Sequence, residues 1–357
     1  MIYYLINTVF SLLALIEIFN THLNRLKKPL FFLCIFFLAL FAGTRLVGFD
    51  INEYQNIFTY STAGSFWSTG IEPGFSFLNS LFAKTGFNSF LLFVAIVVTI
   101  CYSFFINKYS PFFFLSLLLY FSSFFIVKEM GQMRQGLAMG IVLIACSAAF
   151  ERNLKRFLFF SVIAITIHYS AIVVLPVYYI CTRTISTMKL IMIVAVSFVF
   201  LVIPLFSIVT TVLRFIPIAA VQSKVSGLLL SDLFVQKIGL SSSLILRFII
   251  VALLLIFRKS LKANFAYSEE VLMLYIYGFV LFMVFNSMSE VANRTSIYFR
   301  VLEILIIPNL ICLIKRRSIR TVVLAVFILN SFISINRLFS DNDGYKEYNP
   351  YKSFLFE

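Results

Sequence analysis

The sequence predicts an all-α polytopic membrane protein with about 12 transmembrane helices (11–13), and its composition excludes a water-soluble globule. The chain has 357 residues, of which 61% are hydrophobic and only 12% are charged. Its mean hydropathy is +0.99, whereas soluble domains are about half apolar and a quarter charged. The 45 Phe and 17 Tyr residues suit lipid-facing walls and interfacial belts.

The apolar residues form runs long enough to cross a bilayer, which takes about 20 residues of helix. The first run lacks a basic n-region and a small-residue cleavage site, so we expect it to be a retained span and not a cleaved signal. Residues 73–83 are apolar but too short, which favours a re-entrant or interfacial segment. The predicted spans are 2–20, 30–46, 88–106, 111–127, 134–150, 157–180, 188–206, 241–257, 270–288, 297–314 and 319–336.

The orientation of the spans follows from the short loops that carry Lys and Arg, because such loops stay in the cytoplasm. The near-neutral segments between them, including 45–87 and 288–296, are therefore expected outside. The basic loops are 21–29, 107–110, 151–156, 258–269 and 315–320.

The basic residues after 241–257 conflict with this alternation of spans, and we expect one further crossing around 205–223 to resolve the conflict. Pro204 and Pro217 bound that crossing and Arg214 lies within it. Both termini are then outside, and the extracytoplasmic loops lie near 48–72 and 224–240. No shift in composition marks a second domain, so we expect a single polytopic membrane domain over residues 1–357.

Several chemistries are excluded by residue counts and spacing. The chain has two histidines, His22 and His168, and its five cysteines lie mostly in apolar runs, which predicts no metal site and no disulfide framework. No phosphate-binding glycine loop of a nucleotide-driven pump is present, and we expect no cofactor. The net charge of +14 reflects orientation in the membrane, so nucleic acid is not an expected partner.

Polar residues near the predicted outer ends of the spans are the functional candidates. Arg45 can pair with a phosphate through its planar guanidinium, Asp50 can take a proton from a hydroxyl, and Tyr54 follows on the same segment. The alternative is an interfacial arginine beside a solvated acidic loop. In the next outer segment, Arg134 and Gln135 enter a span at its N-terminal end, where backbone N–H groups favour an anion.

Two further groups lie on the same predicted side of the membrane. His168 occupies the outer half of the run 157–180, and its imidazole suits general acid or base chemistry, although a buried neutral histidine is the plainer interpretation. Arg294 and Arg300 flank the outer entry of the run 297–314, and they are not i,i+3 or i,i+4 neighbours. Several cations and a few acids at one face predict a site for a phosphorylated ligand with a hydroxyl to activate.

These segments, taken in order, resemble the EpsG-like family of exopolysaccharide and O-antigen polymerases, the Wzy type. The likeness begins with Arg45, Gly48, Asp50 and Tyr54 and with Glu72-Pro73-Gly74, and it extends over nearly the whole chain. The other matching residues are Gln132, Arg134, Gln135, Ala138, His168, Ser170, Pro176, Arg294, Tyr298, Phe299, Pro350, Tyr351 and Lys352.

The resemblance implies metal-independent glycosyl transfer at the periplasmic face of the bacterial inner membrane. A growing glycan on undecaprenyl diphosphate would be the donor, one lipid-linked oligosaccharide unit the acceptor, and a chain-length regulator a partner in the bilayer. The expected catalytic residues are Arg45, Asp50, Arg134, His168 and Arg294. The expected substrate-binding residues are Tyr54, Glu72, Gln132, Gln135, Glu290, Asn293 and Arg300.

Two alternatives remain at this stage. A transporter or flippase for lipid-linked sugars would place charges at the bilayer midplane and repeat its two halves, and the sequence favours neither feature. An O-antigen ligase would use the same lipid diphosphate donor and a similar set of arginines, so spacing alone does not separate it from a polymerase.

Overall fold

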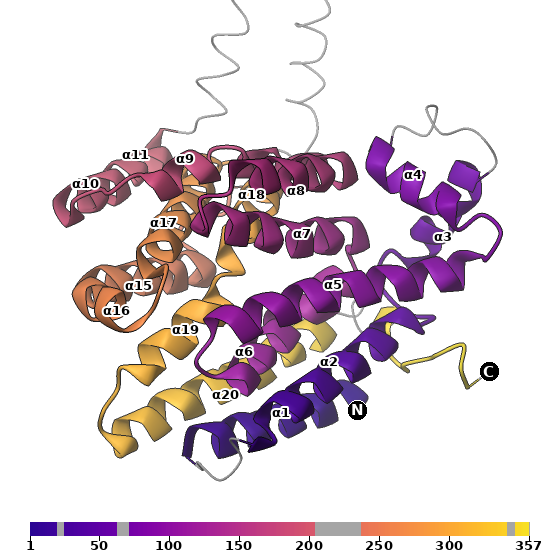
Figure 1. Cartoon of the computed structure of the whole chain (residues 1–357), viewed down its shortest axis with the longest axis horizontal. Coiled ribbons are helices and arrows are strands. Elements are labelled where there is room, and N and C mark those ends of the chain that lie inside the picture. Colours follow the sequence, from indigo (N-terminus) through magenta and orange to yellow (C-terminus); the bar gives the residue numbers. More distant parts are fainter. Residues whose placement is uncertain (20–24, 63–70, 204–236, 341–346, 357) are drawn as a thin grey trace, which may run out of the picture. The chain divides into compact units, whose positions relative to one another are not determined.

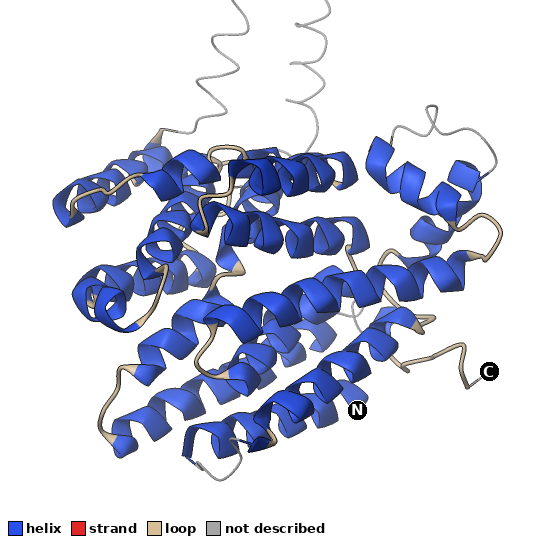
Figure 2. Cartoon of the chain, in the orientation of Figure 1, coloured by secondary structure: helices blue, strands red, loops and turns tan. Residues whose placement is uncertain are grey.

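The computed structural model describes residues 1–19, 25–62, 71–203, 237–340 and 347–356. Within these residues every regular element is a helix (Figure 2), as the sequence predicts. The chain forms two compact units, unit 1 with residues 1–175 and 303–357 and unit 2 with residues 176–302. Figure 1 labels the helices of both units.

Four helices of the described residues are long and apolar enough to cross a membrane: Ile2–Phe19, Phe87–Tyr109, Met133–Phe150 and Arg317–Ser340. A fifth results if the bent pair Ser289–Arg300 and Glu303–Cys312 counts as one span. The expected total of about twelve is therefore not confirmed. The additional crossing expected around 205–223 lies outside the described residues.

Unit 1 contains most of the long helices. α5 (Phe87–Tyr109) packs against both α2 (Lys27–Gly43) and α7 (Met133–Phe150), and α7 packs against α8 (Leu154–Ile167). Gly43 permits the contact of α2 with α5, since a Cβ there would lie 2.9 Å from the Leu92 Cα; small residues allow such close approach. The remaining helices are α1 (Ile2–Phe19), α3 (Ile51–Thr62), α4 (Pro73–Leu81), α6 (Phe113–Tyr120), η2 (Phe121–Glu129), η3 (Tyr169–Val174), α19 (Glu303–Cys312) and α20 (Arg317–Ser340).

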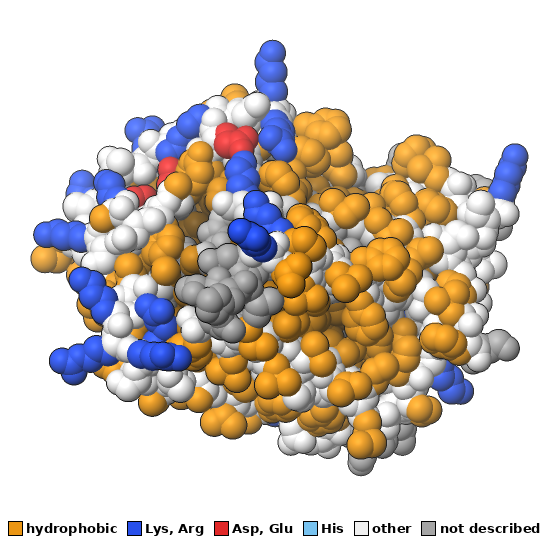
Figure 3. Space-filling view, turned by 60° about the horizontal axis from the view of Figure 1, so that its bottom comes forward, with side chains coloured by type: hydrophobic (Ala, Val, Ile, Leu, Met, Phe, Trp, Pro, Cys, Tyr) orange, Lys and Arg blue, Asp and Glu red, His pale blue; other side chains and the backbone are white. Residues whose placement is uncertain are grey.

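The helices of unit 1 differ in how much of their surface is covered. The apolar 18-residue stretch that makes each helix a candidate span is 94% buried in α7 but only 17% buried in α20. α7 is therefore a core helix. On α1 the exposed side chains Leu5, Val9, Leu12 and Ile16 recur every three or four residues, which aligns them on one face. Figure 3 shows hydrophobic side chains over wide areas of one face of the molecule, as expected of a surface that contacts lipid.

Unit 2 is organised around α17 (Ser268–Val284), which packs against the six other described helices of the unit. Gly278 allows α18 to lie close, because a Cβ at this position would overlap the Phe299 side chain. The other helices are α9 (Val177–Thr182), α10 (Thr187–Ser197), α11 (Val199–Val202), α15 (Ser242–Ile256), α16 (Arg258–Asn264) and α18 (Ser289–Arg300).

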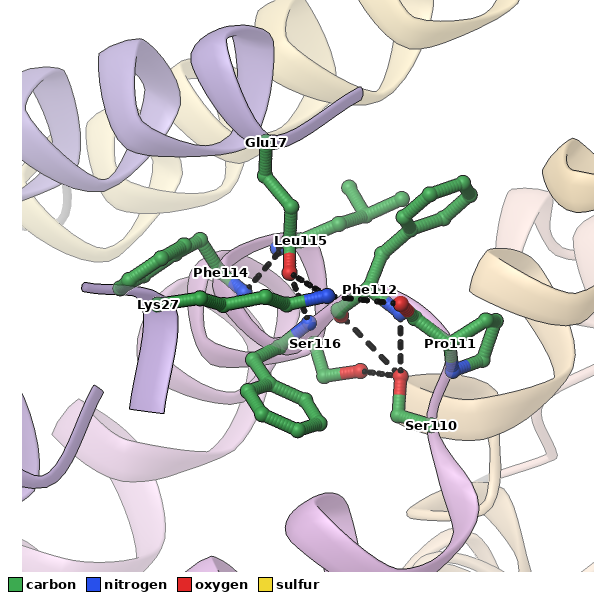
Figure 4. Close-up of polar contacts among 9 residues, drawn as sticks. Glu17, Lys27, Ser110, Pro111, Phe112, Phe114, Leu115 and Ser116 are labelled. Atoms are coloured by element: carbon green, nitrogen blue, oxygen red, sulfur yellow. Dashed lines mark hydrogen bonds and ion pairs between the residues drawn. The ribbon is translucent and has the colours of Figure 1, made fainter. Parts of the chain in front are cut away.

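A buried carboxylate joins three helices at one end of unit 1 (Figure 4). Glu17 of α1 accepts hydrogen bonds from the backbone N–H groups of Phe113 and Phe114 at 2.7 and 2.8 Å, and it pairs with the Lys27 ammonium at 2.7 Å. Lys27 also donates to the carbonyl of Pro111 at 3.0 Å. The Glu17 carboxylate thus caps the first N–H groups of α6, which have no partner within their own helix.

Three expected elements differ from those observed. The run 157–180 is not one continuous span, because the backbone of His168 is extended (φ −152°, ψ 114°) and ends α8. The run 297–314 is divided between α18 and α19. The region 48–72, expected to be a loop, contains the helix α3. In the second expected loop, 224–240, only residues 237–240 are described, and they are not helical.

Candidate functional site

Glu72 links two of the predicted site residues that are distant in the sequence. Its Oε2 accepts a hydrogen bond from the Arg134 guanidinium at 2.8 Å, and its Oε1 lies 2.9 Å from His168 Nδ1. The Glu72 side chain is 8% exposed, and that of His168 is 14% exposed. Arg134, Glu72 and His168 therefore form one partly buried cluster in unit 1, which we call the Glu72 cluster.

The local sequence around Glu72 explains how the cluster forms. Glu72 immediately precedes α4, and Pro73 occupies the first turn of that helix, a position that its fixed φ suits. Gly74 follows, and a Cβ at this position would lie 2.5 Å from Thr166 Oγ1 and 2.8 Å from the Thr166 carbonyl carbon. Because Gly74 has no side chain, α4 can approach the end of α8, where the chain turns at His168.

Arg134 extends from the first turn of α7 and is also bordered by Tyr54 of α3. The backbone N–H of Arg134 donates to the Tyr54 hydroxyl at 3.4 Å, and the guanidinium carbon lies 5.9 Å from the centre of the Tyr54 ring. The Arg134 side chain is 26% exposed. Its Nε is buried and has no hydrogen-bond partner among the described residues, so the part of the guanidinium that a ligand can reach is the exposed remainder of the side chain.

The charge of Glu72 is stabilised by its neighbours. Burial alone would raise the pKa of the Glu72 carboxyl, but the hydrogen bond from His168, that of its own backbone N–H and the charge of Arg134 together lower the pKa to about 2. The carboxylate is therefore ionised at neutral pH. It can hold the Arg134 guanidinium and orient the His168 ring at the same time.

Arg45 lies in unit 1 but is not part of the Glu72 cluster. Its side chain is 2% exposed, and its guanidinium donates to the carbonyls of Ala42 and, at 3.0 Å, Glu129. It thus connects the end of α2 to the end of η2. Its Nε is buried and has no partner among the described residues.

A C-terminal segment of residues 347–355, which we call the C-terminal strap, covers the backbone on either side of Arg45. Leu46 N–H donates to the Lys352 carbonyl at 2.9 Å, and Phe354 N–H donates to the Thr44 carbonyl at 3.0 Å. The Tyr351 ring stacks on Phe41 with the ring centres 4.2 Å apart. The strap therefore fixes the conformation of the chain where α2 ends.

The remaining candidates of unit 1 flank these groups. The side-chain oxygens of Gln132 and Gln135 both accept hydrogen bonds from Lys128, that of Gln135 at 2.7 Å. Asp50 precedes α3, and its backbone carbonyl accepts from Tyr54 N–H at 2.9 Å. Asp50 is half-buried.

The other four candidates belong to α18 of unit 2. Arg294 and Glu290 form an i,i+4 ion pair at 3.1 Å, and their side chains are 54% and 48% exposed. Asn293 is exposed beside them. Arg300, in the last turn of α18, lines a very small cavity with Arg247, and Arg247 donates to Ser296 Oγ at 2.8 Å.

Among the residues that the structure describes, no group of three or more His, Cys, Asp or Glu side chains is arranged to hold a metal ion. The polar groups of unit 1 instead combine a fixed anion, a guanidinium and an imidazole. Such a set can bind an anionic group and accept a proton from a nearby hydroxyl.

Comparison with protein families shows that the model of the EpsG family matches residues 28–353. Comparison with curated proteins and with solved structures finds no match. The matched region includes every predicted site residue, and it extends over most of the described helices.

Proposed function

The chain belongs to the EpsG family, which suggests a polysaccharide polymerase-type function, and we propose that it is a membrane glycosyltransferase acting on polyprenyl-linked glycans. In this proposal it joins undecaprenyl-diphosphate-linked oligosaccharide units at the outer face of the bacterial cytoplasmic membrane, without a metal. The apolar helices support a multi-pass membrane protein. The observation that carries the proposal is the contact of Glu72 with both Arg134 and His168.

Arg134 is proposed to bind the diphosphate of the donor. Its guanidinium is held by Glu72 at 2.8 Å, and the side chain remains a quarter exposed, so part of it can contact a ligand. When the glycosidic bond to the diphosphate breaks, negative charge develops on the departing oxygen. A fixed cation is most effective where such charge appears, and a guanidinium can bind two phosphate oxygens at once.

His168 is proposed to be the general base. If its Nδ1–H donates to Glu72, Nε2 carries the lone pair that accepts the proton of the acceptor hydroxyl. The hydroxyl oxygen then bonds to the anomeric carbon of the donor, and undecaprenyl diphosphate leaves with the electrons of the broken bond. We prefer His168 to Asp50 as the base because a carboxylate orients its ring, as in other base–carboxylate pairs.

The other candidates are proposed to bind substrate. In unit 2, Arg294 and Arg300, with Glu290 and Asn293, would contact the second lipid-linked unit. Gln132 and Gln135 share Lys128 as a donor, and Tyr54 borders Arg134. Arg45, whose guanidinium donates to two backbone carbonyls, would act by positioning the ends of α2 and η2. A chain-length regulator is the proposed protein partner.

The test supplies the purified protein, in lipid vesicles, with a synthetic undecaprenyl-diphosphate-linked repeat unit. A ladder of product lengths is the expected result. A single transfer to a different acceptor would instead identify a ligase, and uptake of the lipid-linked unit without any new bond would identify a transporter.

The site assignment is tested by Arg134→Ala in the same assay. We expect the ladder to disappear, since loss of one such charged donor costs on the order of a hundredfold in rate. Arg156→Ala is the matched control, because Arg156 also pairs with a glutamate, Glu151, but is 40% exposed and outside the cluster. Full activity of Arg134→Ala would remove the diphosphate role from this residue.

A further inference from the structure

Unit 1 contains a second polar site, a groove of about 430 Å³ bordered by the start of α3 and the turn between α4 and α5. This volume lies within the range of about 300–1,000 Å³ that is usual for ligand sites. Apart from Arg45, the polar side chains that line the groove are uncharged amides or hydroxyls: Asn52, Gln55, Thr85 and Asn88. All four are exposed, so a ligand in the groove can reach these side chains.

The walls of the groove belong to two helices that are packed together. Phe58 of α3 contacts Phe87 at the start of α5, with ring centres 5.7 Å apart, and Phe90 one turn later at 5.8 Å. Between α4 and α5, Gly86 has a φ of +87°, a conformation that residues with a side chain rarely adopt. A Cβ there would meet nothing within 4 Å, so the space beside the turn is open.

The groove is poorly suited to a phosphate. Arg45 is the one charged residue among its lining residues, but its guanidinium is directed to the Ala42 and Glu129 carbonyls and its side chain is 2% exposed. Side-chain amides both donate and accept hydrogen bonds, which matches hydroxyl groups that do the same. Leu46, Ile51 and Phe87 supply an apolar wall against which the C–H groups of a sugar ring can pack.

We propose that this groove binds an uncharged sugar residue of the glycan, separately from the Glu72 cluster, which takes the diphosphate. The inference rests on the proposed function, since it is the lipid-linked glycan that supplies both chemistries. Helix α3 serves both sites: its buried Tyr54 borders Arg134, and its exposed Asn52 and Gln55 line the groove. Because α3 contributes residues to both sites, it holds the bound sugar at a fixed position relative to the diphosphate.

The test measures binding of the lipid-free repeat-unit oligosaccharide, released by mild acid from the lipid-linked unit, to the full-length protein in detergent by calorimetry. The variant Asn52→Ala/Asn88→Ala is expected to bind it about tenfold more weakly, the loss expected for two neutral hydrogen bonds. Asn56→Ala is the matched control, because Asn56 is an exposed asparagine of the same helix that does not line the groove. Arg134→Ala should retain wild-type affinity, because the probe has no diphosphate.

Equal affinity of the double variant and the wild-type protein, or the absence of saturable binding to the wild-type protein, would overturn the inference and leave the polymerase assay unaffected. The proposed polymerase function fails separately if the product ladder is absent. In that case, oligosaccharide binding that still depends on Asn52 and Asn88 would support the groove as a sugar site.

Discussion

Two glutamates of unit 1, Glu17 and Glu72, each bind a cationic side chain from another helix, but their other partners are of different kinds. Glu17 pairs with Lys27 at 2.7 Å and accepts from the backbone N–H groups of Phe113 and Phe114. Glu72 pairs with Arg134 at 2.8 Å and contacts His168 at 2.9 Å. One carboxylate thus holds mainly backbone, whereas the other holds two ionisable side chains.

The difference in partners indicates a difference in role. The backbone N–H groups at the start of α6 would be unsatisfied without Glu17, so that carboxylate stabilises the packing of α1 and α2 on α6. The partners of Glu72 keep capacity for a ligand, because the side chains of Arg134 and His168 remain 26% and 14% exposed. A buried ion pair is therefore not by itself a sign of function. The polar groups around the pair that a ligand can still reach are more informative.

The largest expected effect is on stability, in Glu17→Ala. Removing one partner of a buried ion pair costs about 3–5 kcal/mol, and we expect about 3 kcal/mol, the low end, because Lys27 is 21% exposed. Chemical unfolding in detergent measures the loss. The molecules that remain folded should retain their specific activity. A lost product ladder with unchanged unfolding would assign Glu17 to the functional site and contradict its structural role.

Glu72→Gln, unlike Glu17→Ala, should slow the reaction itself. The amide keeps the shape of the side chain but removes the charge that orients His168 and holds Arg134, so we expect polymerisation to slow about a hundredfold. The rate of ladder formation, normalised to folded protein, is the measurement. Glu72→Asp retains the charge and should recover part of the rate. If Gln and Asp were equally impaired, the charge would not be what the site requires.

The long apolar helices of the chain could be predicted from sequence, because hydrophobic runs identify them directly. The polar helix α3 could not be predicted by the same criterion. Its buried residues Tyr54, Ile57 and Phe58 recur at helical spacing, but only two helical turns carry them and the segment is polar overall. The break at His168 was also not apparent, since the apolar run continues on both sides of the residue.

The Glu72 cluster could be predicted only in part. Arg134 and His168 are candidates because they are polar residues beside apolar runs, and Glu72 is expected among the substrate-binding residues. The contacts that join them link residues 62 and 96 positions apart in the sequence. Spacing within one helix gives no information on such pairs. The nearest local signal is Pro73-Gly74, since the proline begins α4 and the glycine permits its approach to Thr166.

The pH dependence of stability distinguishes Glu72 from an ordinary carboxylate. Its pKa is about 2 in the folded protein against an ordinary value of 4.5, so its stabilising contribution is complete above about pH 4.5 and is lost as the pH falls through about 2. The difference in unfolding free energy between the wild type and Glu72→Gln should stay constant from pH 7 to 5. It should then shrink by about 2 kcal/mol at lower pH. Shrinkage already between pH 7 and 6 would contradict the lowered pKa.

The smallest expected effect is that of Arg294→Ala on α18, which extends the comparison to an exposed pair. Arg294 and Glu290 are about half exposed, and such i,i+4 pairs contribute only about 0.3–0.5 kcal/mol to stability. We therefore expect unfolding within about 0.5 kcal/mol of the wild type, but a ladder formed about tenfold more slowly, as expected for one lost charged contact to substrate. Arg316→Ala, an exposed arginine of a predicted cytoplasmic loop, is the control. If both variants polymerise at the wild-type rate, the exposed pair has no part in the reaction, and the chemistry depends on the residues around Glu72.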